Sequence, residues 1–381
     1  MNEQVVRIRA IDPLLFRDGR PFGADIGSLL AQTLPLPYPS TLAGFVRTFA
    51  GNRWGVDWAD EASVQRVLNI HVRGPLLMRN DKHVFRAPAD AVVWEQGEKK
   101  QVGLTSLRPQ PVQPGEGSNL PPGILPLLPQ KYIEGKPSEG YDLWTWDTLS
   151  QWLADPTGDA TSSPEKIGWL EVEERVHVAI EDDKGTSKEE LLFTVQFLSF
   201  ERYRWEGQAQ REQWALLVRV TADEPVSLQG VGLLGGEKRL AAVEAVDNSR
   251  WLGCPPELGQ ALRGASRIRL FLATPAIFSG GWKPGWLDAN LTGSPPFAPN
   301  LKLQLVSAAV RRHEAVSGWD YREDHRCPKA VRWLAPAGSV YFFQVLEGEP
   351  ELLATEAWLQ SVCDDLQDQR DGYGLALWGI W

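Results

Sequence analysis

One glycine-rich segment that ends in basic residues is the part of this 381-residue sequence best suited to hold a phosphate. Residues 230–239 read GVGLLGGEKR, and they include Gly235, Gly236, Lys238 and Arg239. Glycines let consecutive backbone N–H groups point into one concavity and let an anion approach the backbone closely. Lys238 and Arg239 add positive charge at the rim. The segment predicts either an anion-binding loop or a tight turn with a purely structural role.

The same segment also matches the dinucleotide-binding pattern GxGxxG, at Gly230, Gly232 and Gly235. That pattern needs a strand before it, a helix after it and a βαβ unit around it. Residues 237–246 could form the helix, but the segment follows a run of antiparallel-looking strands, and residues 251–256 offer no return strand. A nucleotide-cofactor enzyme stays open as the lesser alternative, and the secondary structure of residues 237–246 decides it.

Other candidates for chemistry are few. The sequence contains no HExxH, no GxSxG and no P-loop pattern, and its five histidines are scattered. His177, beside Arg175 in a strand-like stretch, could serve as a general base in RNA cleavage, although such a histidine is more often an ordinary sheet residue. The ligand-rich cluster consists of Asp320, Asp324, His325 and Cys327. Its spacing fits no standard metal motif, so we expect neither a metal nor a cofactor.

Composition limits how this chain could bind RNA. Its 39 Lys and Arg against 49 Asp and Glu give a net charge of −10, whereas a free-standing nucleic-acid binder is usually basic. RNA contact would therefore need a local patch and help from a partner. The acidic remainder could dock onto basic neighbours or simply keep the chain dispersed in water.

The cysteines and the apolar segments indicate a compartment. Cys254, Cys327 and Cys363 form no CxxC pair, so we expect neither a disulfide framework nor a zinc ribbon. The first residues do not resemble a signal peptide, and no stretch of 18 apolar residues could span a membrane. Together these features predict a cytoplasmic protein that does not enter a membrane.

Apolar periodicity predicts an α+β chain with antiparallel strands in two halves. Ser40 is expected to cap a helix that Gly51 stops, and residues 95–140, rich in Pro, Gly, Gln and Ser, are expected to be an irregular insertion. A short helix is expected at 144–153 and a longer one at 350–369. The expected strands are 5–11, 68–72, 171–180 and 191–200 as a hairpin, 214–220, 268–272, 301–310, 340–345, and a last strand ending at Trp381.

Several segments resemble one family. FRDGRPF at 16–22, followed by PSTLAG at 39–44, is similar to the CRISPR-associated RAMP proteins, and within them to the third subunit of the Cmr (type III-B) effector complex. GGEKR at 235–239 is similar to the RAMP glycine-rich loop. The C-terminal half adds matches at 309–312, 317–320, 336–341 and 372–379. The resemblance covers the chain in order, except for residues 95–140 and much of 141–170.

This resemblance implies two ferredoxin-like (RRM-like) domains. We place them at residues 1–247, with an insertion at about 95–168, and at residues 248–381. It implies a non-catalytic subunit for antiviral defence that holds the 5′ tag of the guide RNA. The implied neighbours are the large polymerase/cyclase-type subunit and the first backbone RAMP subunit, with target RNA as a further candidate partner. Some RAMP relatives cleave precursor guide RNA with a histidine, and that activity remains the main alternative.

An RRM-like sheet with basic loops can bind a sugar–phosphate chain and leave the bases unstacked. The candidate RNA-binding residues are Arg17, Arg20, Ser40, Arg47, Gly235, Gly236, Lys238, Arg239, Arg311 and Arg312. Any single arginine among them could instead be a solvated surface charge or one half of an intramolecular ion pair.

Overall fold

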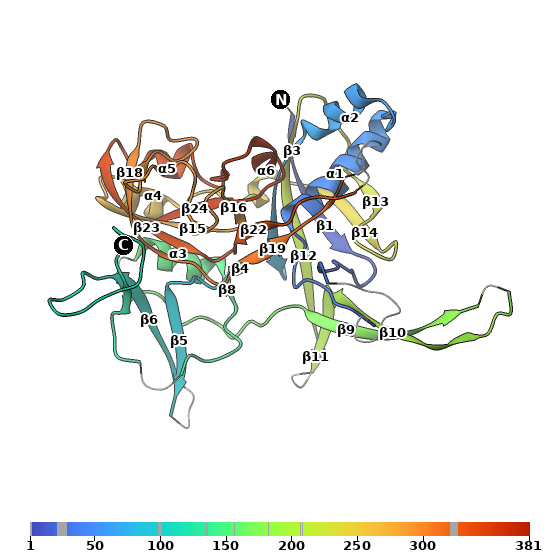
Figure 1. The fold of residues 1–381 in the computed structure, drawn as a ribbon, viewed down its shortest axis with the longest axis horizontal. Coiled ribbons are helices and arrows are strands. Elements are labelled where there is room, and N and C mark those ends of the chain that lie inside the picture. Colours follow the sequence, from blue (N-terminus) through green and yellow to red (C-terminus); the bar gives the residue numbers. More distant parts are fainter. Residues whose placement is uncertain are drawn as a thin grey trace.

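The structure is a computed structural model that describes residues 2–20, 29–97, 101–133, 136–155, 157–181, 183–205, 207, 209–320 and 327–381 (Figure 1). It is a mixed α/β protein whose strands pair antiparallel, except that β2 and β10 are parallel. The larger sheet belongs to the N-terminal half and lies at the centre and right of Figure 1, and the sheet of the C-terminal half lies at the left.

The larger sheet has the strand order β13-β14-β1-β12-β3-β4-β8, and β11 pairs with β12. Its strands are β13 (Gly230–Leu233), β14 (Leu240–Val246), β1 (Asn2–Ala10), β12 (Ala209–Ala222), β3 (His71–Arg79), β4 (Lys82–Arg86), β8 (Leu143–Thr145) and β11 (Glu201–Trp205). The alternation of β1 is confirmed. Val6 and Ile8 are buried in one core cluster with apolar residues of helix α1 (Pro39–Trp54), while Arg7 and Arg9 face the other side and pair with Glu244.

The first helical region differs from the prediction at its ends. Helix α1 begins after Tyr38 without a side-chain cap, so Ser40 is not the cap, and Pro39 supplies a backbone already suited to the first turn. The helix continues past Gly51 and ends at Gly55, which has a left-handed φ of 66°. The strand predicted at 68–72 begins later, at His71, and continues to Arg79 as β3. Asp60 accepts a hydrogen bond from the Ser63 amide and starts helix α2 (Glu61–Leu68).

The C-terminal sheet confirms the three strands predicted at 268–272, 301–310 and 340–345. Its order is β17-β18-β23-β15-β24, with β17 (Thr292–Gly293), β18 (Lys302–Ala309), β23 (Val340–Glu347), β15 (Arg267–Leu272) and β24 (Ala376–Ile380). The helix predicted at 350–369 is wrong. Only α5 (Leu352–Thr355) and α6 (Leu366–Arg370) are helical, and Leu359 between them has a φ of +50° and donates its N–H to Ala376.

Both large sheets repeat one strand order. The strands β14-β1-β12-β3 and β24-β15-β23-β18 each run fourth, first, third, second along their half of the chain, as in a βαββαβ ferredoxin-like fold. The helices are incomplete, because β13 lies between β12 and β14 where a helix is expected, and residues 273–301 contain no helix. Two full ferredoxin-like domains, and their boundary at residue 247, therefore stay predictions.

Smaller elements surround these sheets. Strands β9 (Glu171–Ile180) and β10 (Ser187–Ser199) confirm the predicted hairpin, which extends away from the body in Figure 1. The insertion is more ordered than predicted, because β6 pairs with both β5 and β7. The remaining elements are β2 (Leu30–Ala31), β5 (Ala91–Gln96), β6 (Gln101–Pro109), β7 (Leu127–Pro129), α3 (Trp146–Ala154), the 3-10 turn η1 (Asn248–Arg250), α4 (Pro256–Leu262), β16 (Ala276–Ile277), β19 (Glu314–Val316), β20 (Trp319–Asp320), β21 (Cys327–Pro328) and β22 (Arg332–Ala335).

A buried ion pair joins the start of the insertion to the C-terminal sheet. Arg269 of β15 and Asp90, just before β5, are both fully buried, and their side chains meet at 2.8 Å. Arg269 also donates to the carbonyl of Asp155 at 3.0 Å, and Trp152 donates its indole N–H to Asp90 at 3.0 Å. The two buried charges compensate each other, and the Trp152 ring, 5.3 Å from the Arg269 guanidinium, adds to these contacts. The ion pair therefore joins the insertion to the C-terminal half.

Replacing Asp90 with Asn should lower the free energy of unfolding by about 3 kcal/mol, because it leaves the Arg269 guanidinium buried without its counter-charge. Urea unfolding measures the change. The matched control is Glu351→Gln, which removes the exposed ion pair with Arg263 and should cost less than about 1 kcal/mol. Equal, small effects of the two substitutions would contradict the role given to the buried pair.

Candidate nucleic-acid interface

The glycine-rich segment forms strand β13 and the tight turn that joins it to β14. The Leu234 amide donates to the Arg239 carbonyl at 2.9 Å, and Gly235, Glu237 and Lys238 all have left-handed φ values of 79°, 57° and 52°. Residues 240–246 are a strand, so the helix required by the dinucleotide pattern is absent from this fully described segment. The dinucleotide-binding interpretation of this segment is therefore wrong.

Close packing explains why glycines stand in this segment. A Cβ at Gly235 would lie 2.3 Å from the Leu15 carbonyl oxygen, and the Gly236 amide donates to that same oxygen at 2.8 Å. A Cβ at Gly232 would lie 2.9 Å from the Phe45 ring of α1. The amides of Leu234 and Gly236 are thus already bonded to carbonyls. What the turn can offer a phosphate is mainly the side chains of Lys238 and Arg239.

The loop that carries the first family-like motif lies against this turn. Residues 16–18 pair with residues 32–34: the Leu34 amide donates to the Phe16 carbonyl at 2.7 Å, and the Asp18 amide donates to the Gln32 carbonyl at 3.1 Å. Arg17 and Arg20 are both exposed, and Arg17 donates to the Arg20 carbonyl at 3.1 Å. Arg20 also pairs with Asp18 at 3.2 Å. The end of the motif, residues 21–22, lies outside the described residues.

A third segment, the base of the β9–β10 hairpin, completes the arrangement. Phe197 of β10 is fully buried in a small cluster with Leu15. The guanidinium of Arg239 lies 4.3 Å from the centre of the Phe197 ring, and that of Arg175 lies 5.1 Å from it. One aromatic ring therefore holds a cation from the glycine turn and a cation from the hairpin at fixed positions.

We call Arg17, Arg20, Arg175, Lys238 and Arg239 the basic cluster. Its members come from three segments that meet at Leu15, and carboxylates accompany them: Asp18 pairs with Arg20, and Glu173 pairs with Arg175 at 2.7 Å. The Glu173 hydrogen bond raises the pKa of Arg175. Sequence reasoning considered Arg175 only as a neighbour of a catalytic histidine. It missed Phe197, because alternation in a strand does not reveal which loop packs on it.

Two predicted contact residues, Ser40 and Arg47, are bonded to other parts of the fold. Ser40 lies 2.8 Å from the Tyr373 hydroxyl. Arg47 is only 6% exposed, donates to the Ile70 carbonyl at 2.8 and 3.2 Å, and pairs with Asp371. These bonds tie α1 to the segment before β24. A buried guanidinium with these partners is not available to a phosphate, so we remove Arg47 from the candidate interface. RNA contact by Ser40, which is only partly buried, stays a prediction.

Arg311 and Arg312 lie at a separate place, after β18. Arg311 is exposed and donates weakly to the Ala87 carbonyl at 3.4 Å. Arg312 is exposed. Within the described part of the chain, no hydrogen bond or ion pair joins either residue to the basic cluster. Their role in RNA contact stays a prediction.

Tyr38 links the segment after Arg312 to the start of helix α1. Its hydroxyl donates to the Ala315 carbonyl at 3.1 Å. Burial raises the pKa of Tyr38 to about 12, and the carboxylates of Glu314 and Asp18 add to the effect. The Tyr38 hydroxyl, just before α1, is thus bonded to β19 of the C-terminal half.

The predicted ligand-rich cluster is only partly described. Asp324 and His325 lie outside the described residues, whereas Cys327 is exposed. Among the residues that the structure describes, no group of three His, Cys, Asp or Glu side chains is placed to hold a metal ion. A search of the same residues found no helix with the length and apolar character needed to cross a membrane.

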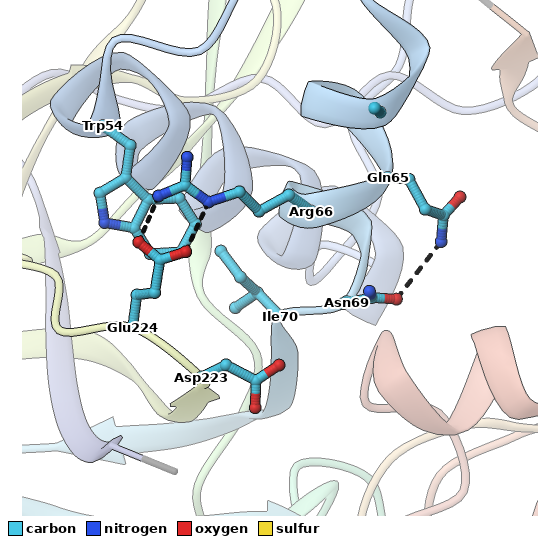
Figure 2. A pocket seen from close by; sticks show the side chains of 8 residues that line it. Trp54, Gln65, Arg66, Asn69, Ile70, Asp223 and Glu224 are labelled. Carbon is cyan, nitrogen blue, oxygen red and sulfur yellow. Dashed lines mark hydrogen bonds and ion pairs between the residues drawn. The ribbon is translucent and has the colours of Figure 1, made fainter.

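A cavity of about 360 Å³ lies between helices α1 and α2 and the end of β12 (Figure 2). It is lined by Trp54, Ala62, Gln65, Arg66, Asn69, Ile70, Asp223 and Glu224. The guanidinium of Arg66 lies 4.8 Å from the Trp54 ring centre and donates to Glu224 at 2.7 Å, so its charge is neutralised. No member of the basic cluster lines this cavity, and we keep it apart from the candidate interface.

The family follows from comparison with known proteins. The family described as CRISPR-associated protein (Cas_Cmr3) matches residues 6–381. The chain belongs to this family. It is thus a Cmr-type CRISPR-associated protein, the kind of subunit found in type III-B CRISPR effectors, and the resemblance found in the sequence is confirmed.

Solved structures resemble the chain only distantly. A chain of the type III-B Cmr-beta bound to cognate target RNA and AMPPnP is 16% identical with a TM-score of 0.47, over 92% of this chain and 87% of that one. A second, of Cmr-beta bound to cognate target RNA, gives the same identity and TM-score over 89% and 86%. A chain of the Csm3–Csm4 subcomplex in the type III-A CRISPR-Cas interference complex is 11% identical with a TM-score of 0.33, over 90% and 94%. No curated protein matches the sequence.

Replacing Gly235 with Ala should destabilise the protein by about 3 kcal/mol, because the new Cβ combines a left-handed φ with a clash against the Leu15 carbonyl. Gly264→Ala is the matched control, since Gly264 has a φ of 69° with open space around it and should cost only about 1 kcal/mol. Urea unfolding measures the loss of stability in each of the two variants. Equal costs would mean that the turn does not press on Leu15.

Proposed function

We propose that this chain is a non-catalytic RNA-binding subunit that holds the 5′ tag of the guide RNA in a type III-B effector complex. The basic cluster carries the proposal, because it combines the two segments with the family resemblance, the 16–20 loop and the glycine turn, at one place. Their backbones are fixed against each other before any ligand arrives. A preformed site binds a flexible chain with less loss of entropy.

The chemistry of the cluster suits a sugar–phosphate backbone. Arg17, Arg20 and Lys238 are exposed, and arginine and lysine form charge-assisted hydrogen bonds with phosphate oxygens. Arg239 and Arg175 lie over the Phe197 ring, which fixes the positions of their positive charges. Such contacts position RNA without reading its sequence. Because the chain carries −10 overall, the cluster neutralises few phosphates, and neighbouring subunits must complete the site.

A bridging role between neighbours fits the exposed hairpin. Strands β9 and β10 extend from the base where Phe197 lies, away from the body of the protein (Figure 1). Val176, Ile180 and Leu192 on this hairpin are exposed apolar side chains. Clustered exposed apolar residues are typical of protein contact surfaces. We infer that the large subunit and the first backbone subunit are the neighbours that meet this chain.

Reversing the charge of Lys238 and Arg239 together, each to Glu, should weaken guide-RNA loading of the reconstituted complex by about tenfold or more, since two phosphate contacts are replaced by repulsion. Guide RNA bound per complex is measured at several salt concentrations. The matched control is Arg263→Glu with Lys302→Glu, which changes the charge equally at exposed positions of the C-terminal half. If complexes with each of the two variants bind as much guide RNA as complexes with the parent chain, the glycine turn does not bind the guide RNA.

The main alternative is a RAMP-type ribonuclease that uses His177. The His177 ring stacks on Phe193 at 5.3 Å, and its Nε2 is buried without a hydrogen-bond partner in the described structure. A general base must reach the proton that it removes, and a buried nitrogen against a sheet is poorly placed for that. This geometry favours a structural histidine.

The purified chain, incubated with precursor guide RNA, should therefore leave the RNA intact, and the His177→Ala variant should behave in the same way. Gel analysis of end-labelled RNA gives the readout. Cleavage at one position that disappears in His177→Ala would overturn the non-catalytic assignment.

A further inference from the structure

Strand β13 forms one edge of the larger sheet, and only β14 pairs with it among the described strands (Figure 1). The Leu234 amide bonds to the Arg239 carbonyl, and in an antiparallel pair bonded and non-bonded residues alternate. Gly230 and Gly232 therefore bond toward β14. Val231 and Leu233 direct their backbone N–H and C=O groups away from β14, toward the free edge.

The side chains of the same two residues are also uncovered. Gly230 and Gly232 face Phe49 and Phe45 of α1, so Val231 and Leu233, which alternate with them, face the opposite side of the sheet. They are 56% and 58% exposed. Leu240 lies opposite Leu233 in the ladder, and Ile11 donates its amide to the Leu240 carbonyl; both are exposed. We call Ile11, Val231, Leu233 and Leu240 the edge patch.

The edge, which no other described strand covers, is also rigid. The contacts of Gly230 and Gly232 with α1 hold β13 from one side, and Arg53 donates to the carbonyl of Gln229, just before the strand, at 2.8 Å. A strand fixed in this way needs little ordering when a partner pairs with it. An edge with free backbone groups and exposed aliphatic side chains favours edge-to-edge pairing, and native proteins usually cover such an edge.

We propose that β13 is the docking edge for an extended segment of a neighbouring protein subunit, which adds a strand to this sheet. The segment would bond to the outward N–H and C=O groups of Val231 and Leu233. Its apolar side chains, alternating along the strand, would cover the edge patch. The proposal rests on the sheet edge alone and does not depend on RNA binding by the basic cluster.

Two features favour a protein strand over other occupants. The edge patch consists of aliphatic side chains, which offer no aromatic ring for base stacking, and the nearby Arg9 is already paired with Glu244. Pairing with a second copy would bring together two strands of four residues, far less than the roughly 1,000 Å² of a stable interface. A neighbouring subunit can add the strand to a larger contact elsewhere.

Hydrogen exchange tests the pairing directly. In the isolated chain the amides of Val231 and Leu233 should exchange rapidly, and in the intact effector complex they should become at least about tenfold slower. The slowing should persist after ribonuclease treatment. Three results would overturn the proposal: amides that stay fast in the complex, protection that is lost with the RNA, or protection that grows with the concentration of the isolated chain and so indicates self-pairing.

A charge variant tests the partner side. Val231→Lys with Leu233→Lys should reduce co-purification of one protein subunit with the tagged chain by about tenfold, because the lysines place charge where the partner's apolar residues pack. The matched control is Val331→Lys with Leu366→Lys, at positions 61% and 67% exposed. Unfolding by urea confirms that both variants remain folded. Full retention of every subunit by the Val231 and Leu233 variant would overturn the proposal.

Discussion

The carbonyl of Leu15 lies against the glycine turn so closely that only glycine fits at position 235, and the amide of Gly236 bonds to it. This one backbone contact joins segments from the two ends of the N-terminal half. The basic residues of each segment lie within five positions of it along the chain: Arg17 and Arg20 on one side, Lys238 and Arg239 on the other. The side chain of Leu15 adds a third segment, since it shares a buried cluster with Phe197.

The arginines of this acidic chain divide into two groups by burial and partner. Arg269 and Arg47 are buried and bonded to carboxylates and carbonyls, so their charge stabilises contacts between distant parts of the chain. Members of the basic cluster lie at the surface or over an aromatic ring, and their carboxylate partners are local. A phosphate can compete with an exposed local partner, but not with a buried one whose loss leaves an unpaired charge.

Sequence reasoning found what local patterns encode. The alternation of β1, the β9–β10 hairpin and helix α1 follow from periodicity and turn residues, and the glycine turn was correctly placed next to basic side chains. It failed where the role of a residue depends on a partner that is far away in the sequence. Arg47 pairs with Asp371, and the sequence around either residue gives no sign of that contact.

The helix predicted at 350–369 failed for a related reason. Its apolar residues Leu353, Ala357 and Val362 are indeed buried, but Leu359 and Val362 between the short helices bond to β24 and the turn before it instead of to their own helix. Burial was predicted correctly at these three positions but not at Leu366, which is 67% exposed, and the continuous helix that should have produced it was wrong. Phe197 was missed because its partners, Arg239 and Arg175, come from other elements.

Each glycine of segment 230–236 is required by a different contact. Together these contacts explain why Val231 and Leu233 are exposed. Gly230 and Gly232 bring the strand onto α1, and Gly235 brings the turn onto Leu15. The residues left between them, Val231 and Leu233, must then point outward. The same four-residue strand thus leads straight into the turn that carries Lys238 and Arg239. A strand added at β13 would extend the sheet beside the basic cluster, which is where an acidic chain with few free cations needs a neighbour to complete an RNA site.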